Sequence, residues 1–381
     1  MSDIPPNGGA PKIAAVRSTI LDVPLIRPHK FATTTATAQP ILLVEVTTED
    51  GITGYGEGVT PGGPWWGGES VETMKALVDK YLAPVVVGQT LDEIPRLVED
   101  FDKFVARGRF AKAGLEIAMF DAYARSLGVP MHALLGGKVR DSIDCTWALG
   151  VAPLDEMIGE ISEILDSGRH RSFKLKMGSG DPRTDTDRII ALCEHIGDRA
   201  GLRIDVNARW DRLTAVRYLP ALAEAGIELF EQPTPTEQLG VLAELARLTN
   251  VPIMADESVQ SPHDALEIVR REAAGVLAIK TTKLGGLLRS KETVAVARAA
   301  GLACHAATSL EGPIGTAASL HLACADPGFT FGSELFGPLL LAHELLTEPI
   351  TYDDGRVHLP EGPGLGVDLD PDAVSRFRRA D

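Results

Sequence analysis

Cysteine is scarce in this chain of 381 residues, which contains only Cys145, Cys193, Cys304 and Cys324. None of them belongs to a CxxC pair, so the spacing argues against a zinc ribbon or a disulfide framework. The chain also lacks an apolar run of the roughly 18–20 residues that a membrane span requires. Its opening, MSDIPPNGGAPK, lacks the basic and apolar regions of a signal peptide. These absences predict a protein of the reducing cytoplasm.

Positive charge is in deficit, because 37 lysines and arginines stand against 53 aspartates and glutamates, for a formal net charge of −16. Nucleic acids and anionic membranes are bound by basic surfaces, so neither is expected as a partner. Acidity by itself can also serve only solubility. An anionic small-molecule substrate would need positive charge inside a site, supplied by lysines or a metal ion.

Two kinds of hydrophobic pattern divide the chain. Residues 13–23 and 40–48 are rich in β-branched side chains and predict strands, whereas apolar residues recur at helical spacing from Glu69 to Gly128. Strands followed by a run of helices indicate an α+β domain. The predicted organisation is a disordered tail over 1–12, an α+β domain over 13–135, a barrel over 136–355 and a C-terminal segment over 356–381 that packs back on the first domain.

Short apolar strands alternate with helical segments of about 10–15 residues after Asp141, which is typical of βαβ units. Eight strands are predicted, with ends near Leu149, Lys176, Asn207, Glu231, Asp256, Lys280, His305 and Glu334. From Lys176 onward these ends are 24 to 31 residues apart, about the length of one strand, one helix and two loops. The repeat predicts a (β/α)-barrel, in which functional side chains gather at the C-terminal ends of the strands.

Asp205, Glu231 and Asp256 end three consecutive strands of the predicted barrel. A single aspartate at a strand end is commonly the N-cap of the next helix. Three carboxylates that converge on one barrel mouth, however, repel one another unless a cation lies among them. Carboxylate oxygens suit Mg²⁺ or Mn²⁺, whereas Zn²⁺ more often takes histidine or cysteine. The spacing therefore predicts a divalent-metal site.

Lysines end the strands on both sides of this acidic group. Side chains alternate along a strand, so Lys174 and Lys176 share one face. Repulsion between the two ammonium groups is expected to lower at least one lysine pKa and so to provide a base, unless both side chains are simply solvated. Lys280 ends a strand on the far side of the three acidic strands. Lysines on opposite sides of a metal suit proton transfer at the carbon α to a carboxylate.

These segments resemble the enolase superfamily, and specifically its muconate-lactonizing subgroup. In the barrel the resemblance is carried by FKLKMG (173–178), RIDVNARW (203–210), ELFEQP (228–233), PIMADES (252–258), AIKTTKLGG (278–286), LEGPIGTAASLHL (310–322) and SELFGPLLL (333–341). In the first domain it is carried by IRPHK (26–30). The resemblance covers about residues 13–370. It implies an enolase-type (β/α)-barrel with an N-terminal α+β domain that caps the barrel mouth.

The resemblance implies that the ligands of Mn²⁺ or Mg²⁺ are Asp205, Glu231 and Asp256. It implies that the acid/base lysines are Lys176 and Lys280, assisted by Lys174. It implies that Asn207 and Glu334 lie in the second shell or at the substrate. Further candidates for such positions in this chain are Ser309, His29 and Trp66. The implied reaction is the reversible cycloisomerisation of cis,cis-muconate, a small dicarboxylate, to muconolactone through a metal-stabilised enolate, in catechol catabolism. Such enzymes are homo-oligomers, often homo-octamers.

Other charged positions are interpreted as non-catalytic. Lys280 stands where the mandelate-racemase subgroup has an aspartate, so His305 lacks that partner and is interpreted as a pocket or packing residue. Lys283 follows the strand end and is expected to be solvated or structural. Glu257 is expected to point away from the site by strand alternation, where it can pair with a lysine. The charges interpreted as surface or interdomain are Arg109, Lys112 and Arg209.

Trp65 and Trp66 lie in the glycine-rich segment TPGGPWWGGES (60–70). They are either a core or interface pair or the aromatic tip of a mobile capping loop. The segment departs from the family pattern, in which an aliphatic residue stands near Pro61 and tryptophans are fewer. This departure leaves open the preference between plain and chlorinated muconate.

Other functions are compatible with two lysines in such a barrel. o-Succinylbenzoate synthases and dipeptide epimerases use the same pair, but the epimerases carry a DxD-type motif near the eighth strand, where this chain has SELFGP. A Schiff-base aldolase would use Lys176 or Lys280 as its nucleophile and would leave the three carboxylates unexplained. A non-catalytic barrel would need neither the lysines nor the metal ligands.

Overall fold

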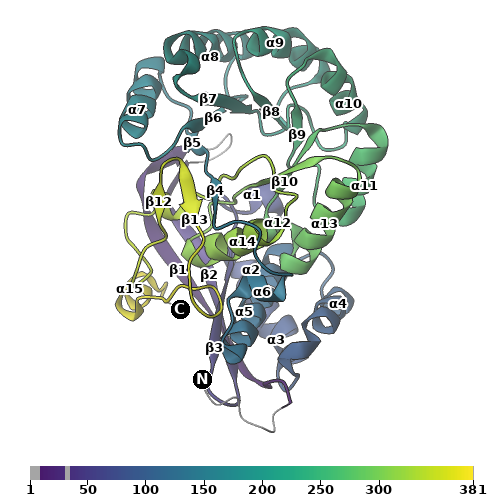
Figure 1. The fold of residues 1–381 in the computed structure, drawn as a ribbon, viewed down its shortest axis with the longest axis vertical. Helices are drawn as coiled ribbons and strands as arrows, with labels where there is room; N and C mark the ends of the chain where they lie inside the picture. The colour runs from purple at the N-terminus through teal and green to yellow at the C-terminus, as the bar shows by residue number, and fades with distance from the viewer. Residues whose placement is uncertain (1–8, 31–34, 381) are drawn as a thin grey trace.

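The computed structural model describes residues 9–30 and 35–380 (Figure 1). Residues 1–8 of the tail predicted over 1–12 lie outside this part of the chain, and Lys12 pairs with Thr90 in an isolated antiparallel bridge. Figure 1 shows two parts, an antiparallel sheet with helices formed by the first third of the chain and a ring of parallel strands surrounded by helices. The predicted (β/α)-barrel with an N-terminal α+β capping domain is confirmed.

The capping domain is an antiparallel sheet covered by helices. Its strands pair in the order β1 (Ile13–Lys30), β2 (Thr35–Thr48) and β3 (Thr53–Gly58). Both β1 and β2 extend beyond the predicted strands at 13–23 and 40–48. The helical segments are α1 (Pro64–Gly67), α2 (Val71–Leu77), the π-helix η1 (Val78–Leu82), α3 (Ala83–Val86), the 3-10 turn η2 (Leu91–Glu93), α4 (Ile94–Phe104), α5 (Arg109–Leu127) and α6 (Met131–Leu134).

Helix α5 is buried along most of its length because two glycines let its backbone approach β3. A Cβ added at Gly54 would lie 2.1 Å from the main-chain nitrogen of Ala122. A Cβ added at Gly56 would lie 1.9 Å from the main-chain oxygen of Gly114. This contact fixes α5 against the sheet, and Glu116 on the same helix reaches the barrel.

Seven parallel strands form the barrel sheet, in the order β5-β6-β7-β8-β9-β10-β11. The strands are β5 (Trp147–Leu149), β6 (Ser172–Lys176), β7 (Gly201–Asp205), β8 (Leu229–Glu231), β9 (Ile253–Ala255), β10 (Val276–Ile279) and β11 (Ala303–Ala306). The helical segments between and after them are α7 (Leu154–Asp166), α8 (Pro182–Ile196), η3 (Gly197–Arg199), α9 (Arg212–Glu224), α10 (Leu239–Leu248), α11 (Pro262–Arg271), α12 (Thr281–Leu284), α13 (Leu287–Ala299), α14 (Pro313–Ala325) and η4 (Gly337–Leu340).

The eighth predicted strand, which was expected to end near Glu334, is reduced to isolated bridges. Ser333 pairs in parallel with Ala306 on one side and with Cys145 on the other. Main-chain hydrogen bonds run on both sides, from Thr146 N to Ser333 O and from Glu334 N to Ala306 O. The segment DPGFTFGSELFGP contains two prolines and three glycines, which shorten a strand. The barrel therefore closes through a few hydrogen bonds instead of a full strand.

Apolar side chains fill the strand faces that carry the polar site residues. Leu229, Met254 and Ala278 belong to a separate buried apolar cluster. Each precedes by two residues one of the polar strand-end positions, Glu231, Asp256 and Lys280, and therefore shares its face. The charged groups consequently lie above an apolar layer, which limits their contact with water from below.

The end of the chain contacts both parts of the fold. Strands β12 (Tyr352–Asp353) and β13 (Arg356–His358) form a small antiparallel sheet with β4 (Ser142–Asp144). Helix α15 (Pro371–Phe377) contacts β1. Beyond it, the guanidinium of Arg379 pairs with both carboxylate oxygens of Asp22 at 2.6 Å. The last residues are therefore attached to the capping domain.

Two buried carboxyl groups of the capping domain bind the N-termini of barrel helices. Glu57 accepts hydrogen bonds from the main-chain N–H groups of Gly312 and Gly315, at the start of α14. Glu116 accepts them from the first two residues of α13, Leu287 and Leu288. The first N–H groups of a helix have no partner within it and attract negative charge. These contacts join the two domains.

The free energy of unfolding should depend on pH through these two groups. Burial raises the pKa from 4.5 to about 7 for Glu57 and to about 8 for Glu116. Their contribution to stability is complete below the unfolded value of 4.5 and is lost as pH rises through the folded values. Between pH 5 and pH 8 we expect chemical denaturation to show a loss at least about 1 kcal/mol larger in the wild type than in Glu116→Gln. Equal losses in the two proteins would contradict the assignment.

Candidate active site

The strand ends bring the polar residues of the predicted site to one end of the barrel. In the parallel register Lys176 of β6 lies opposite Asp205 of β7, and Asp205 lies opposite Glu231 of β8. Asp256 follows the last residue of β9, and Lys280 follows the last residue of β10. Strands β7, β8 and β9 lie between Lys176 and Lys280 in the sheet. The two lysines are thus separated by the three strands that carry the carboxylates.

Lys174 is the centre of a buried ion-pair network. Its ammonium lies 2.9 Å from Glu231 Oε2, 2.6 Å from the Glu334 carboxylate and 3.6 Å from Asp205 Oδ2. Burial opposes the charge on Lys174, but these carboxylates outweigh it and hold its pKa well above the ordinary value. The prediction that repulsion between Lys174 and Lys176 lowers a lysine pKa is therefore wrong for Lys174. Carboxylates from other strands decide its charge.

Lys176 and Lys280 each contact a different carboxylate. Lys176 Nζ lies 2.5 Å from Asp205 Oδ2 and also donates to Asn207 Oδ1 at 3.2 Å. Lys280 Nζ lies 2.6 Å from Asp256 Oδ2 and 4.3 Å from the centroid of the Trp66 ring. Burial opposes the charge of Lys280, but Asp256 outweighs it and the pKa is raised. Both lysine side chains accordingly lie against a carboxylate, and Asp256 holds Lys280 as a cation.

Asn207 orients Asp205. Its main-chain N–H donates to Asp205 Oδ1 at 2.8 Å and its side-chain amide donates to Asp205 Oδ2 at 3.1 Å. The backbone of Asn207 has a φ of 48°, in the left-handed region that asparagine tolerates better than most residues. The turn that follows β7 therefore holds Asn207 and Asp205 in one fixed arrangement.

Glu231 has the features of a cation ligand. It is fully buried, and its Oε1 has no hydrogen-bond partner among the residues that the structure describes. Burial and then the charge of Asp205 raise the pKa of Glu231 to about 8. Within residues 9–30 and 35–380, no three acidic, histidine or cysteine side chains form a ready-made metal cage. The lysines occupy positions between the carboxylates, and the unpaired oxygen of Glu231 fits a bound cation.

Glu257 points into the site, so the prediction that it points away is wrong. Its Oε1 accepts a hydrogen bond from the Asn207 amide at 3.1 Å, and its Oε2 is buried without a partner among the described residues. Burial and then the charges of Asp256 and Asp205 raise its pKa to about 7. Strand alternation failed here because β9 ends at Ala255 and the chain has already turned.

Lys283 is structural, and the alternative that it is solvated is wrong. Its side chain is 2% exposed, and its ammonium lies 2.8 Å from Asp256 Oδ1. The spacing of three residues between Lys280 and Lys283 was the feature of the sequence that could have predicted this position of the Lys283 side chain. Residues three apart share a face when a helical turn follows the strand, and α12 is that turn.

A small cavity of about 30 Å³ lies between the capping domain and the strand ends. The predicted site residues that line it are Lys174, Lys176, Lys280, His29, Trp66, Asn207 and Glu334. Ser309 is fully buried beside the cavity and does not line it, whereas its neighbours Thr308 and Leu310 do. Ser309 accepts a hydrogen bond from Thr282 at 3.2 Å.

The two histidines near the site are buried. His29 on β1 is 2% exposed, and burial followed by the charges of Lys176 and Arg27 lowers its pKa to about 3. His305 Nδ1 lies 3.0 Å from the main-chain oxygen of Phe331, and burial lowers its pKa. Both imidazoles are therefore neutral near pH 7.

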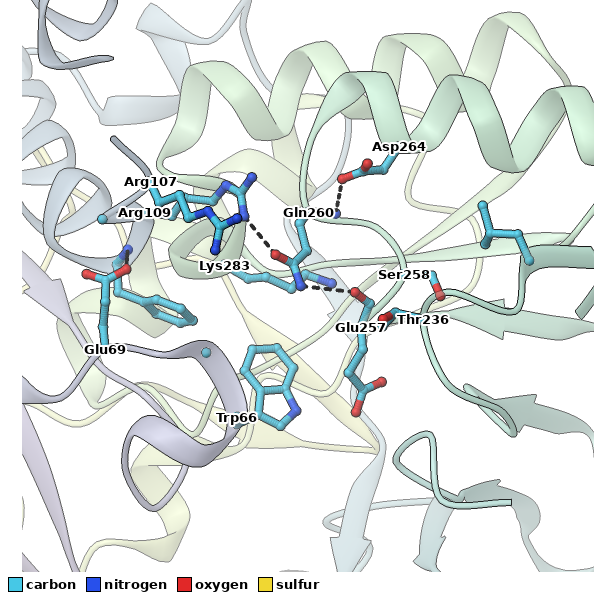
Figure 2. A pocket seen from close by; sticks show the side chains of 14 residues that line it. Trp66, Glu69, Arg107, Arg109, Thr236, Glu257, Ser258, Gln260, Asp264 and Lys283 are labelled. Atoms are coloured by element: carbon cyan, nitrogen blue, oxygen red, sulfur yellow. Dashed lines mark hydrogen bonds between the residues drawn. The ribbon is translucent and has the colours of Figure 1, made fainter. Parts of the chain in front are cut away.

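A larger cavity of about 420 Å³ lies between the domains, next to the site (Figure 2). Trp66 lines both cavities. Arg109 of the capping domain donates to Gln260 of the barrel at 2.7 Å, which is the interdomain role expected of it. Figure 2 also shows Glu69, which accepts hydrogen bonds from the N–H groups of Phe110 and Ala111 and so caps α5.

The fold and the site together define an enolase-type barrel enzyme. Residues 156–373 match the family described as enolase C-terminal domain-like, and residues 15–136 match the mandelate racemase / muconate lactonizing enzyme N-terminal domain. The chain belongs to the mandelate racemase and muconate lactonizing enzyme family of the enolase superfamily. Among residues 9–30 and 35–380, no helix combines the length and hydropathy of a membrane span.

Relatives of the chain include two kinds of cycloisomerase. Muconate cycloisomerase 1 of Rhodococcus opacus is 64% identical over 96% of this chain and 98% of its own length. A chloromuconate cycloisomerase of Cupriavidus pinatubonensis is 40% identical over 95% of this chain and 97% of its own length.

Solved structures show the same two kinds of enzyme. The muconate lactonizing enzyme of Pseudomonas fluorescens, complexed with muconolactone, has a TM-score of 0.95 and 39% identity, over 97% of this chain and 100% of that one. The 2-chloromuconate cycloisomerase of Rhodococcus opacus 1CP has a TM-score of 0.94 and 43% identity, with the same coverage.

Proposed function

We propose that the chain is a muconate cycloisomerase, an intramolecular lyase that interconverts cis,cis-muconate and muconolactone in aromatic catabolism. The observation that carries this function is the 64% identity, over nearly the whole chain, with a relative named muconate cycloisomerase 1. The site supports it with a cavity that is lined by Lys174, Lys176 and Lys280, a positive set suited to a dicarboxylate.

The metal ligands in this proposal are Asp205, Glu231 and Asp256. Muconate cycloisomerases of this superfamily use a divalent metal ion, and we assign Mn²⁺ or Mg²⁺ because the three ligands offer only oxygen. The unpaired Oε1 of Glu231 supports the assignment. When bound, such an ion stabilises the negative charge that develops on a substrate carboxylate.

Lys176 and Lys280 are the proposed acid/base groups. In lactonisation one carboxylate oxygen of muconate forms a C–O bond with the diene, and one proton is added to the carbon α to the other carboxylate. In the reverse direction a lysine removes that proton and the C–O bond breaks. Both lysines line the cavity from strands that are separated by β7, β8 and β9, so each can reach a different face of the substrate.

The remaining site residues bind or orient in this proposal. Lys174 keeps its charge, because carboxylates hold its pKa high, and so can attract a substrate carboxylate while it assists Lys176. Asn207 orients Asp205, and Glu334 accepts a hydrogen bond from Lys174 at 2.6 Å. His29 and Trp66 form the part of the cavity wall that the capping domain supplies. Ser309 acts at most indirectly, behind the cavity lining.

Loss of cis,cis-muconate absorbance near neutral pH tests the function. We expect turnover with Mn²⁺, loss of turnover after EDTA treatment and recovery when Mn²⁺ is added back. Borohydride should trap no substrate on the protein, because the chemistry does not pass through a lysine Schiff base. Absence of turnover with Mn²⁺ and Mg²⁺, or borohydride trapping, would refute the function.

Chloromuconate cycloisomerisation is the second candidate, since two enzymes with that activity in their names are 40% and 43% identical to this chain. The same assay with 2-chloromuconate separates the two. A higher kcat/KM for muconate is expected from the 64% identical relative, and a higher value for the chlorinated substrate would select the second candidate.

Two further properties are proposed, the first from the family resemblance and the second from the scattered cysteines. We propose a homo-octamer, which light scattering of the purified protein measures directly. We also propose a cytoplasmic location, which cell fractionation tests.

A further inference from the structure

Lys283 is a buried lysine for which the proposed chemistry has no use. Figure 2 shows its side chain beside Gln260, at the cavity between the two domains. Its ammonium donates to Asp256 Oδ1 at 2.8 Å, to the main-chain oxygen of Asp256 at 2.7 Å and to that of Ala278 at 3.0 Å. An ammonium group has three N–H donors, so Lys283 has none left for a substrate.

These bonds join two adjacent strands just beyond the end of their ladder. Strands β9 and β10 pair through two residues each, of which the last are Ala255 and Leu277. Asp256 and Ala278 are the residues that follow this last pair along the chain. The one-turn helix α12 begins directly after β10 and turns the chain back, which brings the Lys283 ammonium to these two carbonyl groups. Lys283 thus links the two strands through its side chain, just beyond the last pair of residues in their ladder.

The Asp256 carboxylate is shared between two lysines with different freedom. Its Oδ2 lies 2.6 Å from Lys280 Nζ, and Lys280 also lines the small cavity. Lys280 can therefore exchange Asp256 for a substrate atom. The Oδ1 oxygen is bonded to Lys283, whose other two bonds go to main-chain carbonyl groups. Lys280 is therefore free to move, whereas Lys283 is held in place.

We propose that Lys283 is a positioning residue that fixes the Asp256 carboxylate for the metal ion while Lys280 moves a proton. This inference rests on the proposed function, because it assumes that Asp256 is a ligand. A lysine that acted only as a counter-charge would repel the cation, and its removal would tighten metal binding. A lysine that braces Asp256 gives the opposite result, because the unheld carboxylate loses its orientation.

Mn²⁺ binding to the Lys283→Met protein, measured by calorimetry without substrate, tests the inference. We expect the dissociation constant to rise at least about tenfold, as is typical when a group that holds a metal ligand is removed. With saturating Mn²⁺ we expect kcat to fall at least about tenfold, while KM for muconate changes less than about threefold. Unchanged or tighter Mn²⁺ binding would overturn the inference.

Lys112→Met is the matched control. Lys112 is also buried, and it pairs with Asp102 and the main-chain oxygen of Val105 within the capping domain. We expect this variant to lose stability without a change in Mn²⁺ affinity, and an equal loss of affinity in both variants would also overturn the inference.

If Lys283→Met does not fold, Lys283→Arg replaces it, because arginine keeps the charge but offers its donors in a different, planar geometry. The Lys283→Arg protein should bind Mn²⁺ at least about threefold more weakly than the wild type. An affinity equal to that of the wild type would refute the positioning role of Lys283.

Assays of the wild-type protein distinguish a failure of the proposed function from a failure of the role of Lys283. If it binds no Mn²⁺ and turns over no muconate, the proposed function and this inference fail together. If it does both and Lys283→Met behaves like the wild type, only the role of Lys283 fails.

Discussion

Replacing Lys280 or Lys176 by methionine should lower kcat on cis,cis-muconate by roughly 10²- to 10⁴-fold, the usual contribution of a general acid or base. Methionine keeps the length and apolar bulk of the lysine side chain but carries no proton to transfer. The two lysines lie on strands separated by three others, so neither can replace its partner. Absorbance assays with saturating Mn²⁺ measure the loss. Near wild-type rates in both variants would show that the proton-transfer assignment is wrong.

The fold should survive these substitutions, which distinguishes lost chemistry from lost structure. Thermal unfolding and Mn²⁺ calorimetry on the same preparations provide the check, and Lys112→Met provides a buried lysine away from the cavity. Turnover in D₂O then identifies the lysine that delivers the proton. The configuration at the deuterated carbon of the product differs between syn and anti addition, because Lys176 and Lys280 approach from different strands.

Glu231→Gln should weaken Mn²⁺ binding by at least about a hundredfold, since loss of a ligand costs more than the 10- to 100-fold typical of an outer-shell residue. The substitution keeps the shape of the side chain and removes the charge. Glu231 is fully buried, and its Oε1 has no partner among the described residues. A bound cation would therefore be the partner of this oxygen atom. Calorimetry measures the affinity, and an unchanged dissociation constant would refute the ligand role.

Thermal unfolding with and without Mn²⁺ gives an independent readout for the same substitution. Burial and the charge of Asp205 raise the pKa of Glu231 to about 8, which shows that its negative charge is unfavourable there without a metal. A neutral amide removes this repulsion but also weakens the contact with Lys174. We therefore expect Glu231→Gln to lose most of the stabilisation that Mn²⁺ gives to the wild type in thermal unfolding. An equal Mn²⁺-induced shift in both proteins would contradict the assignment.

The eighth strand shows one limit of reading structure from local pattern. Regular spacing predicted a strand end near Glu334, and the chain does pass between β11 and Cys145 there. The segment pairs through Ser333 alone on each side, because its prolines and glycines do not sustain a ladder. Spacing thus predicted where the chain passes, but it did not predict the extent of pairing, which the prolines and glycines of the segment limit.

Glu257 and Lys283 show a second limit, which concerns direction. Alternation assigns faces only while a strand continues, and both residues come after a strand has ended. Glu257 therefore turned into the site, and Lys283 returned to Asp256 instead of reaching solvent. Ser309 shows the reverse case, because a residue beside two lining residues remains behind the cavity wall.

The sequence by itself determined the barrel, its capping domain and the strand-end positions that carry Asp205, Glu231, Asp256 and the lysines. It could do so because strand alternation and the length of a βα unit are local properties of the chain. Only the tertiary structure decided which ammonium meets which carboxylate. Lys174 meets Glu334 across 160 residues and Lys283 meets Asp256 across 27, and burial then sets the charge of each group. Distances in space and exclusion of water fix these pairings, and neither is encoded in local spacing.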